Sequence, residues 1–297
     1  MAVGAGRPVA AARRDVRCRP APRCLDLAQG APGDAGVGRQ GAEGVRLRAT
    51  IATGLVAVAV LAGCQAAPVT GRNQLIVLPE SQDAQMGLDA YQQILAESEI
   101  SDDPELNGRV QEVGRRIAAA SPHPEWEWQF TLIENDEPNA FALPGGKVGV
   151  NTGLFQVAET DDQLAAVMGH EVAHAIARHG AERMSQQVLV QAGLAGLGLA
   201  TSQTYAALAA QAATLTVILP YSRTQESEAD HIGLVYMAEA GYDPREAIVL
   251  WENFEAYGGA RQPEFLSTHP APGSRIENLR SLLPEVMPIY ERNRQQQ

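Results

Sequence analysis

The chain has 297 residues, of which 45% are hydrophobic, 5% aromatic and 20% charged. These fractions are typical of a globular protein with one or two domains, and they exclude collagen-like, coiled-coil and disordered chains. Residues 1–63 carry nine arginines against four acidic residues, whereas the rest carries 14 basic and 31 acidic residues, a net charge of −17. Because such a charge repels nucleic-acid phosphates, we expect no nucleic-acid partner.

The first 44 residues lack the apolar periodicity of a folded domain. Ala, Gly, Arg and Pro make up 29 of these 44 positions. A segment of this composition buries too little apolar surface to fold. We therefore exclude residues 1–44 from the fold and interpret them as a non-native extension translated upstream of the true start. The alternative is a genuine disordered extension.

A basic and then apolar segment follows, with the pattern of a secretory signal peptide. Arg46 and Arg48 precede an uncharged apolar run over 49–63, which suits a signal-peptide core and is short for a membrane span. The run ends at Leu61-Ala62-Gly63-Cys64, which resembles the bacterial lipobox, whose cysteine takes a diacylglycerol. A plain signal peptide or a short membrane anchor is the alternative. We predict a lipoprotein signal peptide over 45–63 and a lipid anchor on Cys64.

Cys64 is also the only cysteine beyond the excluded segment, so no disulfide is expected. The next residue is Gln65, not Asp, which by resemblance to lipoprotein sorting rules implies a bacterial outer membrane, with the protein facing the periplasm. We expect residues 64–78 to form the lipidated tether. Residues 79–297 are long enough to form one domain with its own core.

The first part of this domain is predicted to contain two helices and three strands. Apolar spacing predicts amphipathic helices over 79–98 and 105–120. Alternation predicts a strand over 127–133, and two short strands over 139–143 and 147–150 flank a Pro-Gly-Gly turn. Together with the helices predicted further along the chain, these elements indicate an α+β fold that is mostly helical.

A well-marked helix comes next. Thr160 and Gln163 form a capping box, two aspartates suit the positive end of the helix, and Gly180 stands where a C-cap belongs. The helix carries His170-Glu171-Val172-Ala173-His174. Its two imidazoles lie about 40° apart on one face and can reach one zinc ion, while Glu171 can hold a water beside it. The alternative is an ordinary charged face. By the same geometry, His179 is expected to face away from the metal.

Catalytic zinc usually takes three protein ligands and keeps one position open, so a third ligand is needed. A helix predicted over 221–240 places Glu226 and Asp230 on one face. That face can supply a carboxylate ligand and, one turn on, a carboxylate that orients a ligating histidine. Glu228 points elsewhere. We interpret it as a solvated charge, with the alternative that it is the ligand.

These motifs resemble the zinc metallopeptidase family of the CaaX prenyl protease, HtpX and Oma, a gluzincin family. The resemblance covers roughly residues 79–284 and is greatest to short periplasmic lipoprotein members of the LoiP type. Besides His-Glu-x-x-His and Glu-x-x-x-Asp, three segments carry it: Asn139-Ala140-Phe141-Ala142-Leu143-Pro144-Gly145-Gly146, Ser222-Arg223-x-x-Glu226-x-x-Ala229-Asp230, and Ser267-Thr268-His269-Pro270.

The resemblance implies a metal site and a mostly helical gluzincin-like domain with a small β-sheet beside the His-Glu-x-x-His helix. His170, His174 and Glu226 would bind one Zn²⁺ per chain, with Glu171 as the general base. Asp230 would orient His170.

Two further segments acquire roles from the same resemblance. Lys147, Val148, Gly149 and Val150 would form the edge strand along which an extended substrate lies, the alternative being an ordinary buried strand. His269 would approach the zinc and either donate to the oxyanion or occupy the open position and silence the enzyme. The alternative for His269 is a surface loop histidine. Arg275 is left as either structural or a partner of a substrate carboxylate.

The expected function is that of a zinc endopeptidase for unfolded or misassembled envelope proteins. The alternative is a chaperone or assembly factor for outer-membrane proteins with a latent or structural zinc site, which would make the assembly machinery a partner. The membrane is expected as a partner through the anchor on Cys64. An uncharged stretch over 188–219 is expected to form two packed helices that shield the site, or else a lipid-contacting hairpin.

Overall fold

The computed structural model describes residues 63–196, 221–257, 264–269 and 274–296. Residues 1–62, with the predicted extension and nearly all of the signal segment, lie outside these ranges, as do residues 197–219 of the uncharged stretch. The strands are β1 (Cys64–Ala66), β2 (Asn73–Leu75), β3 (Gln129–Ile133), β4 (Ala140–Leu143) and β5 (Lys147–Asn151). The helices are α2 (Glu80–Glu97), α3 (Pro104–Ala120), α4 (Asp161–Ile176), α5 (His179–Gly196), α8 (Arg223–Glu239), α9 (Glu246–Tyr257), α10 (Glu264–Thr268) and α11 (Arg275–Asn293), with short 3-10 turns η1 (Thr152–Gln156) and η2 (Arg294–Gln296).

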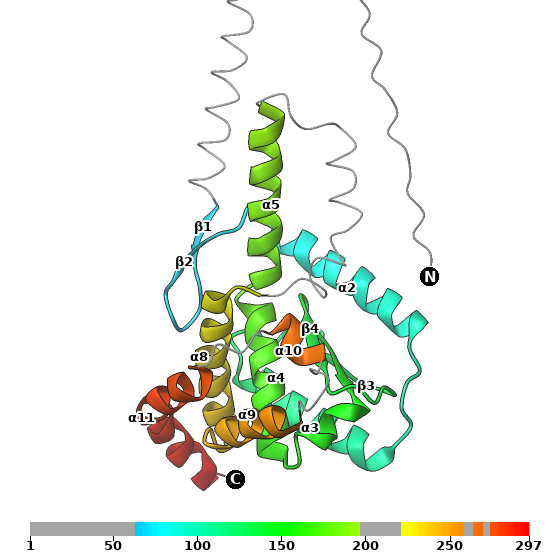
Figure 1. The fold of residues 1–297 in the computed structure, drawn as a ribbon, viewed down its shortest axis with the longest axis vertical. Helices are drawn as coiled ribbons and strands as arrows, with labels where there is room; N and C mark the ends of the chain where they lie inside the picture. Colours follow the sequence, from blue (N-terminus) through cyan, green and yellow to red (C-terminus); the bar gives the residue numbers. More distant parts are fainter. Residues whose placement is uncertain (1–62, 197–220, 258–263, 270–273, 297) are drawn as a thin grey trace, which may run out of the picture. The chain divides into compact units, whose positions relative to one another are not determined.

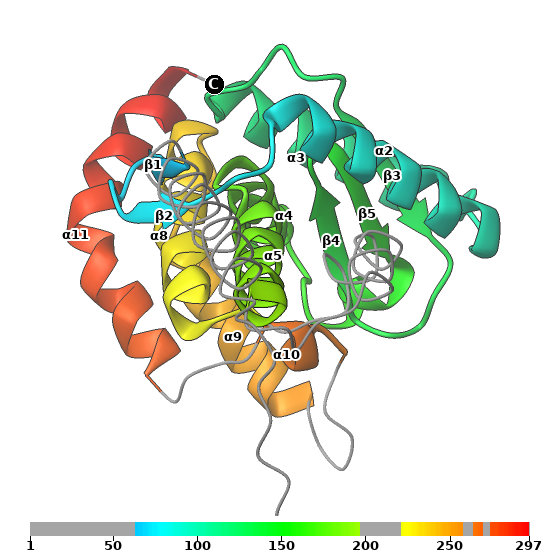
Figure 2. The same ribbon diagram turned by 90° about the horizontal axis from the view of Figure 1, so that it is seen from above.

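Helix α4 is the centre of the described fold. Every residue from Gln163 to Ile176 is buried, and within this run only Gln163, His170, Glu171 and His174 are polar. It contacts β4 on one side and α8 on the other, and α11 packs on the far side of α8 (Figures 1 and 2). Helices α3 and α9 also contact α4. The prediction of a mostly helical α+β domain with a small sheet beside this helix is confirmed.

The sheet has the strand order β3-β5-β4. Strand β5 pairs in parallel with β3 and antiparallel with β4, where Leu143 lies opposite Lys147. All five residues of β5 are buried. The edge strand that the resemblance implied for residues 147–150 is therefore wrong, and the alternative, an ordinary buried strand, is correct. Among the described strands, β4 is the edge that faces α4.

Local signals position the two central helices. Thr160 caps α4 by accepting a hydrogen bond from the backbone N–H of Gln163, although the Gln163 side chain turns to Glu159 and not to Thr160. Helix α8 begins with a complete capping box between Ser222 and Gln225. By contrast, Ser274 makes no side-chain cap at the start of α11.

The end of α4 differs from the prediction. The helix stops at Ile176 and α5 starts at His179, so Gly180 is not a C-cap. Arg178 adopts a left-handed backbone conformation, with φ 55°. Its guanidinium donates to Asp83 and to the carbonyl oxygen of Leu78, and these contacts offset the cost of that conformation in a residue with a Cβ.

The predicted tether is partly folded. Residues 64–75 form the hairpin β1–β2, with Cys64 exposed at its start and paired across the ladder with Leu75. Strand β2 contacts α5, and the N–H of Val77 donates to the Ser185 hydroxyl. None of the described helices is long and apolar enough to cross a membrane. Lipidation of Cys64 stays a prediction.

Helices α4 and α8 approach each other closely because a glycine stands on each at the crossing. A Cβ added to Gly233 would lie 2.9 Å from the backbone nitrogen of His170 and 3.0 Å from the carbonyl carbon of Gly169. Since both of these atoms belong to backbone, neither can yield as a flexible side chain would. The crossing therefore needs glycine at position 233.

We expect Gly233→Ala to lower the free energy of unfolding by about 1–3 kcal/mol, because the two helices must separate. The matched control is Gly108→Ala on α3, where an added Cβ meets nothing within 4 Å. There the better helix propensity of alanine should stabilise the chain by about 0.5–1 kcal/mol. Urea unfolding of the full chain measures both. Equal stability of Gly233→Ala and wild type would contradict the close crossing.

Candidate active site

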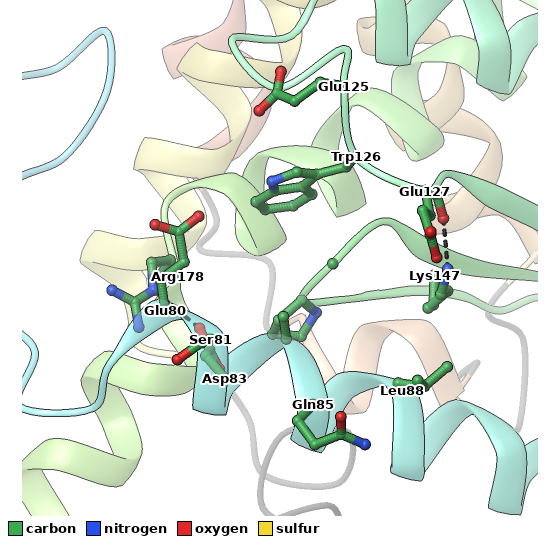
Figure 3. A pocket seen from close by; sticks show the side chains of 13 residues that line it. Glu80, Ser81, Asp83, Gln85, Leu88, Glu125, Trp126, Glu127, Lys147 and Arg178 are labelled. Carbon is green, nitrogen blue, oxygen red and sulfur yellow. Dashed lines mark hydrogen bonds and ion pairs between the residues drawn. The ribbon is translucent and has the colours of Figure 1, made fainter.

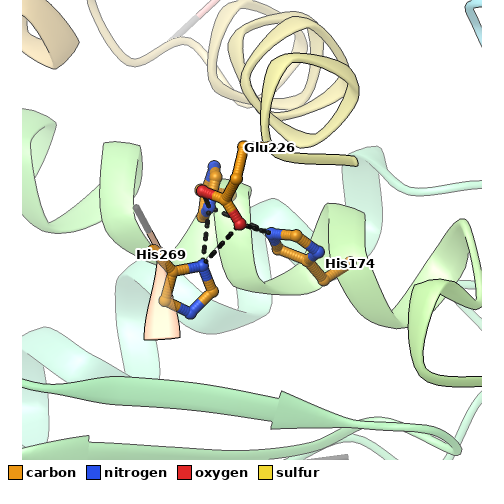
Figure 4. A group of neighbouring side chains, drawn as sticks. His174, Glu226 and His269 are labelled. Atoms are coloured by element: carbon orange, nitrogen blue, oxygen red, sulfur yellow. Dashed lines mark hydrogen bonds and ion pairs between the residues drawn. The ribbon is translucent and has the colours of Figure 1, made fainter. Parts of the chain in front are cut away.

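Four buried side chains from three elements converge on one point. His170 and His174 come from α4, Glu226 from α8, and His269 from the residue after α10 (Figure 4). One nitrogen or oxygen of each lies within 4.8 Å of those of the others. The structure thus brings together the three predicted ligands, and His269 with them. The expectation that His269 is a surface loop residue is excluded, since it is 3% exposed.

The spacing of these atoms suits a small tetrahedral cation. Around an ion with bonds of about 2.1 Å, neighbouring ligand atoms lie about 3.4 Å apart. The Nε2 atom of His170 is 3.1 Å from Nε2 of His174 and 3.5 Å from Oε2 of Glu226. The Nε2 atom of His174 is 3.3 Å from Oε1 of Glu226. Two imidazoles and a carboxylate at this spacing form a donor set that fits zinc.

His269 completes the set through Nδ1. This atom lies 3.2 Å from Nε2 of His170 and 3.1 Å from Oε1 of Glu226. The other ring nitrogen, Nε2, lies 3.3 Å from Oε1 of Glu171. His269 therefore stands where a fourth ligand would stand, between the other donors and Glu171.

Glu171 differs from the other carboxylates of this cluster because one of its oxygens makes no hydrogen bond among the described residues. It is 2% exposed, and its Oε1 atom has no hydrogen-bond partner in the part of the chain that the structure describes. Burial raises the pKa of Glu171, an effect that the nearby His269 and His170 partly oppose, and the backbone N–H of Ala142 in β4 donates to the carboxylate. A raised pKa brings a carboxylate closer to the range in which it can accept and return a proton.

Glu226 and Asp230 of α8 pair with the buried histidines and so offset the cost of burying them. Oδ1 of Asp230 lies 3.0 Å from Nδ1 of His170, the ring nitrogen that points away from the cluster. This contact agrees with the expectation that Asp230 orients His170. Burial would raise the pKa of Glu226, but hydrogen bonds from His170, His174 and His269 outweigh it and hold that pKa far below its usual range. Burial lowers the pKa of His174 well below its usual value, so this imidazole is neutral and its lone pair can bind a metal.

Arg275 is an internal partner of these carboxylates. Its guanidinium donates to Glu226 at 2.9 Å and to Asp230 at 2.5 Å, and it stacks 3.6 Å above the ring of Trp251. With Arg275 only 3% exposed and paired within the chain, the structure favours the structural interpretation over a role as partner of a substrate carboxylate.

Two sequence interpretations are wrong. His179 does not face away from the site, because α4 ends before it, and its Nδ1 lies 2.8 Å from Nδ1 of His174. Glu228 is not a solvated charge, since it is 5% exposed and bonded to His179 and Arg72. It does not belong to the group of converging donors either.

Tyr221, which the sequence analysis did not single out, also packs against the site. Its ring stacks on His174, with ring centroids 3.8 Å apart. With β4, Glu171 and His269, it lines a small hollow beside the site. No spacing pattern marks this tyrosine in the sequence. Its only signal is its position directly before the Ser-Arg pair of the resembling segment.

A larger cavity, of about 390 Å³, opens where β4 ends. Figure 3 shows that it is lined by α2, Trp126 and Lys147, and the turn at Pro144 and Gly145 completes it. It contains none of the four converging side chains. The hollow beside Glu171 is lined by residues 139–143, so the two openings follow each other along the same strand. Lys147 is buried there, donating to the carbonyl oxygen of Glu127 at 2.5 Å.

Comparison with known proteins places this site in a family. The model of Peptidase family M48 matches residues 104–283, more than half of the chain. The mitochondrial metalloendopeptidase OMA1 of Schizosaccharomyces pombe is 34% identical over 228 residues, which cover 74% of this chain and 66% of that protein. The beta-barrel assembly-enhancing protease of Escherichia coli K12 is 32% identical over 254 residues, which cover 82% of this chain and 52% of that protein.

OMA1 of Saccharomyces cerevisiae is 40% identical over 180 residues, which cover 57% of this chain and 50% of that protein. The chain thus spans between half and two thirds of the length of these relatives. The matched range contains the two central helices and all four converging side chains. The predicted family resemblance is confirmed, and this chain belongs to peptidase family M48.

Proposed function

We propose that this chain is a zinc-dependent endopeptidase that hydrolyses peptide bonds of unfolded or misassembled cell-envelope proteins. The observation that carries the proposal is Oε1 of Glu171, which is buried beside three side chains with the spacing of zinc ligands, makes no hydrogen bond among the described residues, and has Nε2 of His269 3.3 Å away. A structural metal site has no use for such a carboxylate, since its ligands close the coordination shell. In this account His170, His174 and Glu226 hold the ion.

Glu171 does the proton transfer. A bound divalent cation supplies Lewis-acid chemistry, lowering the pKa of a water and polarising the scissile carbonyl. Glu171 would take a proton from the attacking water at Oε1 and return it to the leaving amide nitrogen. Its raised pKa suits both steps. Asp230 holds the His170 ring in place by accepting from Nδ1, which leaves Nε2 directed at the other donors.

Strand β4 is the surface along which we place an extended substrate. It is the edge of the sheet nearest to α4, and residues 139–143 line the hollow that contains Glu171. Main-chain hydrogen bonds to such an edge give affinity with little sequence preference, which suits a protease for unfolded chains. Beyond β4, the cavity at Pro144 and Gly145 offers room for the segment to continue.

The envelope assignment comes from the sequence and from one group of relatives. The lipobox-like segment predicts an anchor on Cys64 and placement at the outer membrane, facing the periplasm. The Escherichia coli relative carries the name beta-barrel assembly-enhancing protease, whereas the OMA1 relatives are named as mitochondrial. The membrane and misassembled envelope proteins are the partners that we propose on this basis.

The position of His269 supports a latent resting state. Its Nδ1 stands where the open coordination position of a catalytic site would lie. The same arrangement favours the second candidate function, an assembly factor for outer-membrane proteins whose metal has four protein ligands and is structural. Activity after removal of His269 distinguishes the two.

We expect Glu171→Gln to lower the rate of casein cleavage by about 10²- to 10⁴-fold while the chain retains its metal, because the amide cannot take the proton. Glu159→Gln, at an exposed site before α4, is the matched control and should cleave at the wild-type rate. Cleavage is measured on zinc-loaded full chain, with metal content determined for each variant. Undiminished cleavage by Glu171→Gln would exclude Glu171 as the base.

We expect His269→Ala to raise casein cleavage about tenfold or more, because the variant frees the position that Nδ1 occupies. If His269 instead donates to the oxyanion, the same variant should lose about 10²-fold or more. Cleavage rates of the zinc-loaded variant and wild type decide between these outcomes. No cleavage by either protein, with zinc bound to both, would favour the assembly factor.

A further inference from the structure

A chain of buried hydrogen bonds leads from His174 to the hairpin β1–β2. Nδ1 of His179 lies 2.8 Å from Nδ1 of His174, and Nε2 of His179 lies 3.0 Å from Oε2 of Glu228. Glu228 in turn accepts from Nε of Arg72 at 2.6 Å and from the hydroxyl of Thr70. Both histidines and Glu228 are buried, at most 5% exposed.

The break between α4 and α5 makes this series of hydrogen bonds possible. In a continuous helix, His179 would point about 180° away from His170. Because Arg178 adopts the left-handed conformation, α5 takes a new direction, and His179 turns back toward His174. The contacts of Arg178 with Asp83 and the Leu78 carbonyl hold the break in place.

Only one arrangement of protons satisfies the chain when both imidazoles are neutral. When His174 binds a metal ion, its Nε2, which faces the other ligand atoms, must present its lone pair to the ion, so the proton is on Nδ1. That N–H donates to Nδ1 of His179, which leaves the proton of His179 on Nε2, facing Glu228. Glu228 also accepts from the hydroxyl of Thr70 and from the guanidinium of Arg72, so it accepts from His179 as a carboxylate.

The two histidines of α4 are thus oriented in different ways. Asp230 contacts His170 directly. Among the described residues, no carboxylate contacts the outer nitrogen of His174, and the imidazole of His179 stands between it and Glu228. Partners of this kind fix the tautomer and ring orientation of a metal ligand, and their loss weakens metal binding.

The hairpin β1–β2 supplies Arg72, the cation at the end of this series of hydrogen bonds. Arg72 donates to Glu228 and also, through Nη1 and Nη2, to both oxygens of Glu182 at 2.8 and 2.9 Å. Gln225 donates to Glu182 as well. Without Arg72, the buried carboxylates of Glu228 and Glu182 would lose the cation that pairs with both. Burial of unpaired charges is costly, so the two side chains would move from their present positions.

We propose that His179 and Glu228 position His174 for metal binding, and that Arg72 of the hairpin β1–β2 holds Glu228 in place. This inference rests on the proposed function, in which His174 is a metal ligand. His179, Glu228 and Arg72 act through His174 and touch neither the substrate nor the metal, so they are positioning residues. The segment next to Cys64 then belongs to the architecture of the metal site.

The test compares metal binding by the full chain and its variants. His179→Phe keeps the size of the side chain and removes both nitrogens, and we expect zinc affinity in chelator competition to fall about 10- to 100-fold. His179→Gln keeps one acceptor and one donor and should remain within about fivefold of wild type. Arg72→Met should weaken binding about three- to tenfold, while Arg115→Met, an exposed arginine on α3, should not change it.

A second readout separates positioning from stability. In Co²⁺-loaded protein, His179→Phe should change the visible absorption bands that report ligand geometry, and His179→Gln should restore them. A purely structural role would lower the melting temperature of the metal-free chain and leave those bands unchanged, which would overturn the inference. If His179→Phe does not fold, the zinc affinities of Arg72→Met and its control Arg115→Met test the positioning role instead.

The outcomes also distinguish this inference from the proposed function. If wild type binds zinc and both His179→Phe and Arg72→Met bind it equally tightly, the positioning role is wrong and the protease proposal stands. If wild type binds neither zinc nor cobalt, the proposed function fails and this inference fails with it.

Discussion

Burial of three ionisable side chains within five residues of helix α4 is the constraint on which this structure depends. His170, Glu171 and His174 are each at most 4% exposed, and they lie against the apolar core of the domain. Uncompensated polar groups in such surroundings cost several kcal/mol each. Helix α8 provides the compensation by presenting Glu226 and Asp230 to the two imidazoles. The two helices therefore fold as one unit with the site between them.

Other parts of the fold serve this pair of helices. Gly233 lets the backbones approach, and Arg275 neutralises Glu226 and Asp230 of α8 from the start of α11. On the opposite side, the hairpin β1–β2 carries Arg72 to the carboxylates beside His179. Glu171 alone keeps an oxygen without a hydrogen bond among the described groups of the cluster. That exception is what a proton-transferring group requires, because a fully bonded carboxylate has no position left for water.

Sequence reasoning predicted the parts of the fold that local signals determine. The cap at Thr160 located α4, a helix was predicted over 221–240, and helical geometry placed Glu226 and Asp230 on one face, which the structure turns toward the histidines. What it missed depends on contacts between distant residues. No glycine or proline marks the turn at Arg178, which Asp83 holds from 95 residues away. The burial of Glu228 likewise depends on Arg72, 156 residues earlier in the chain.

X-ray absorption at the metal K-edge of the zinc-loaded full chain tests the central claim most directly, because it reports the ligands of the ion itself. The account predicts one ion per chain with a first shell of imidazole nitrogens and one carboxylate oxygen at about 2.0–2.2 Å. Three imidazoles would correspond to the arrangement that includes His269. A chain that binds no ion, or an ion with fewer than two imidazole ligands, would contradict the account.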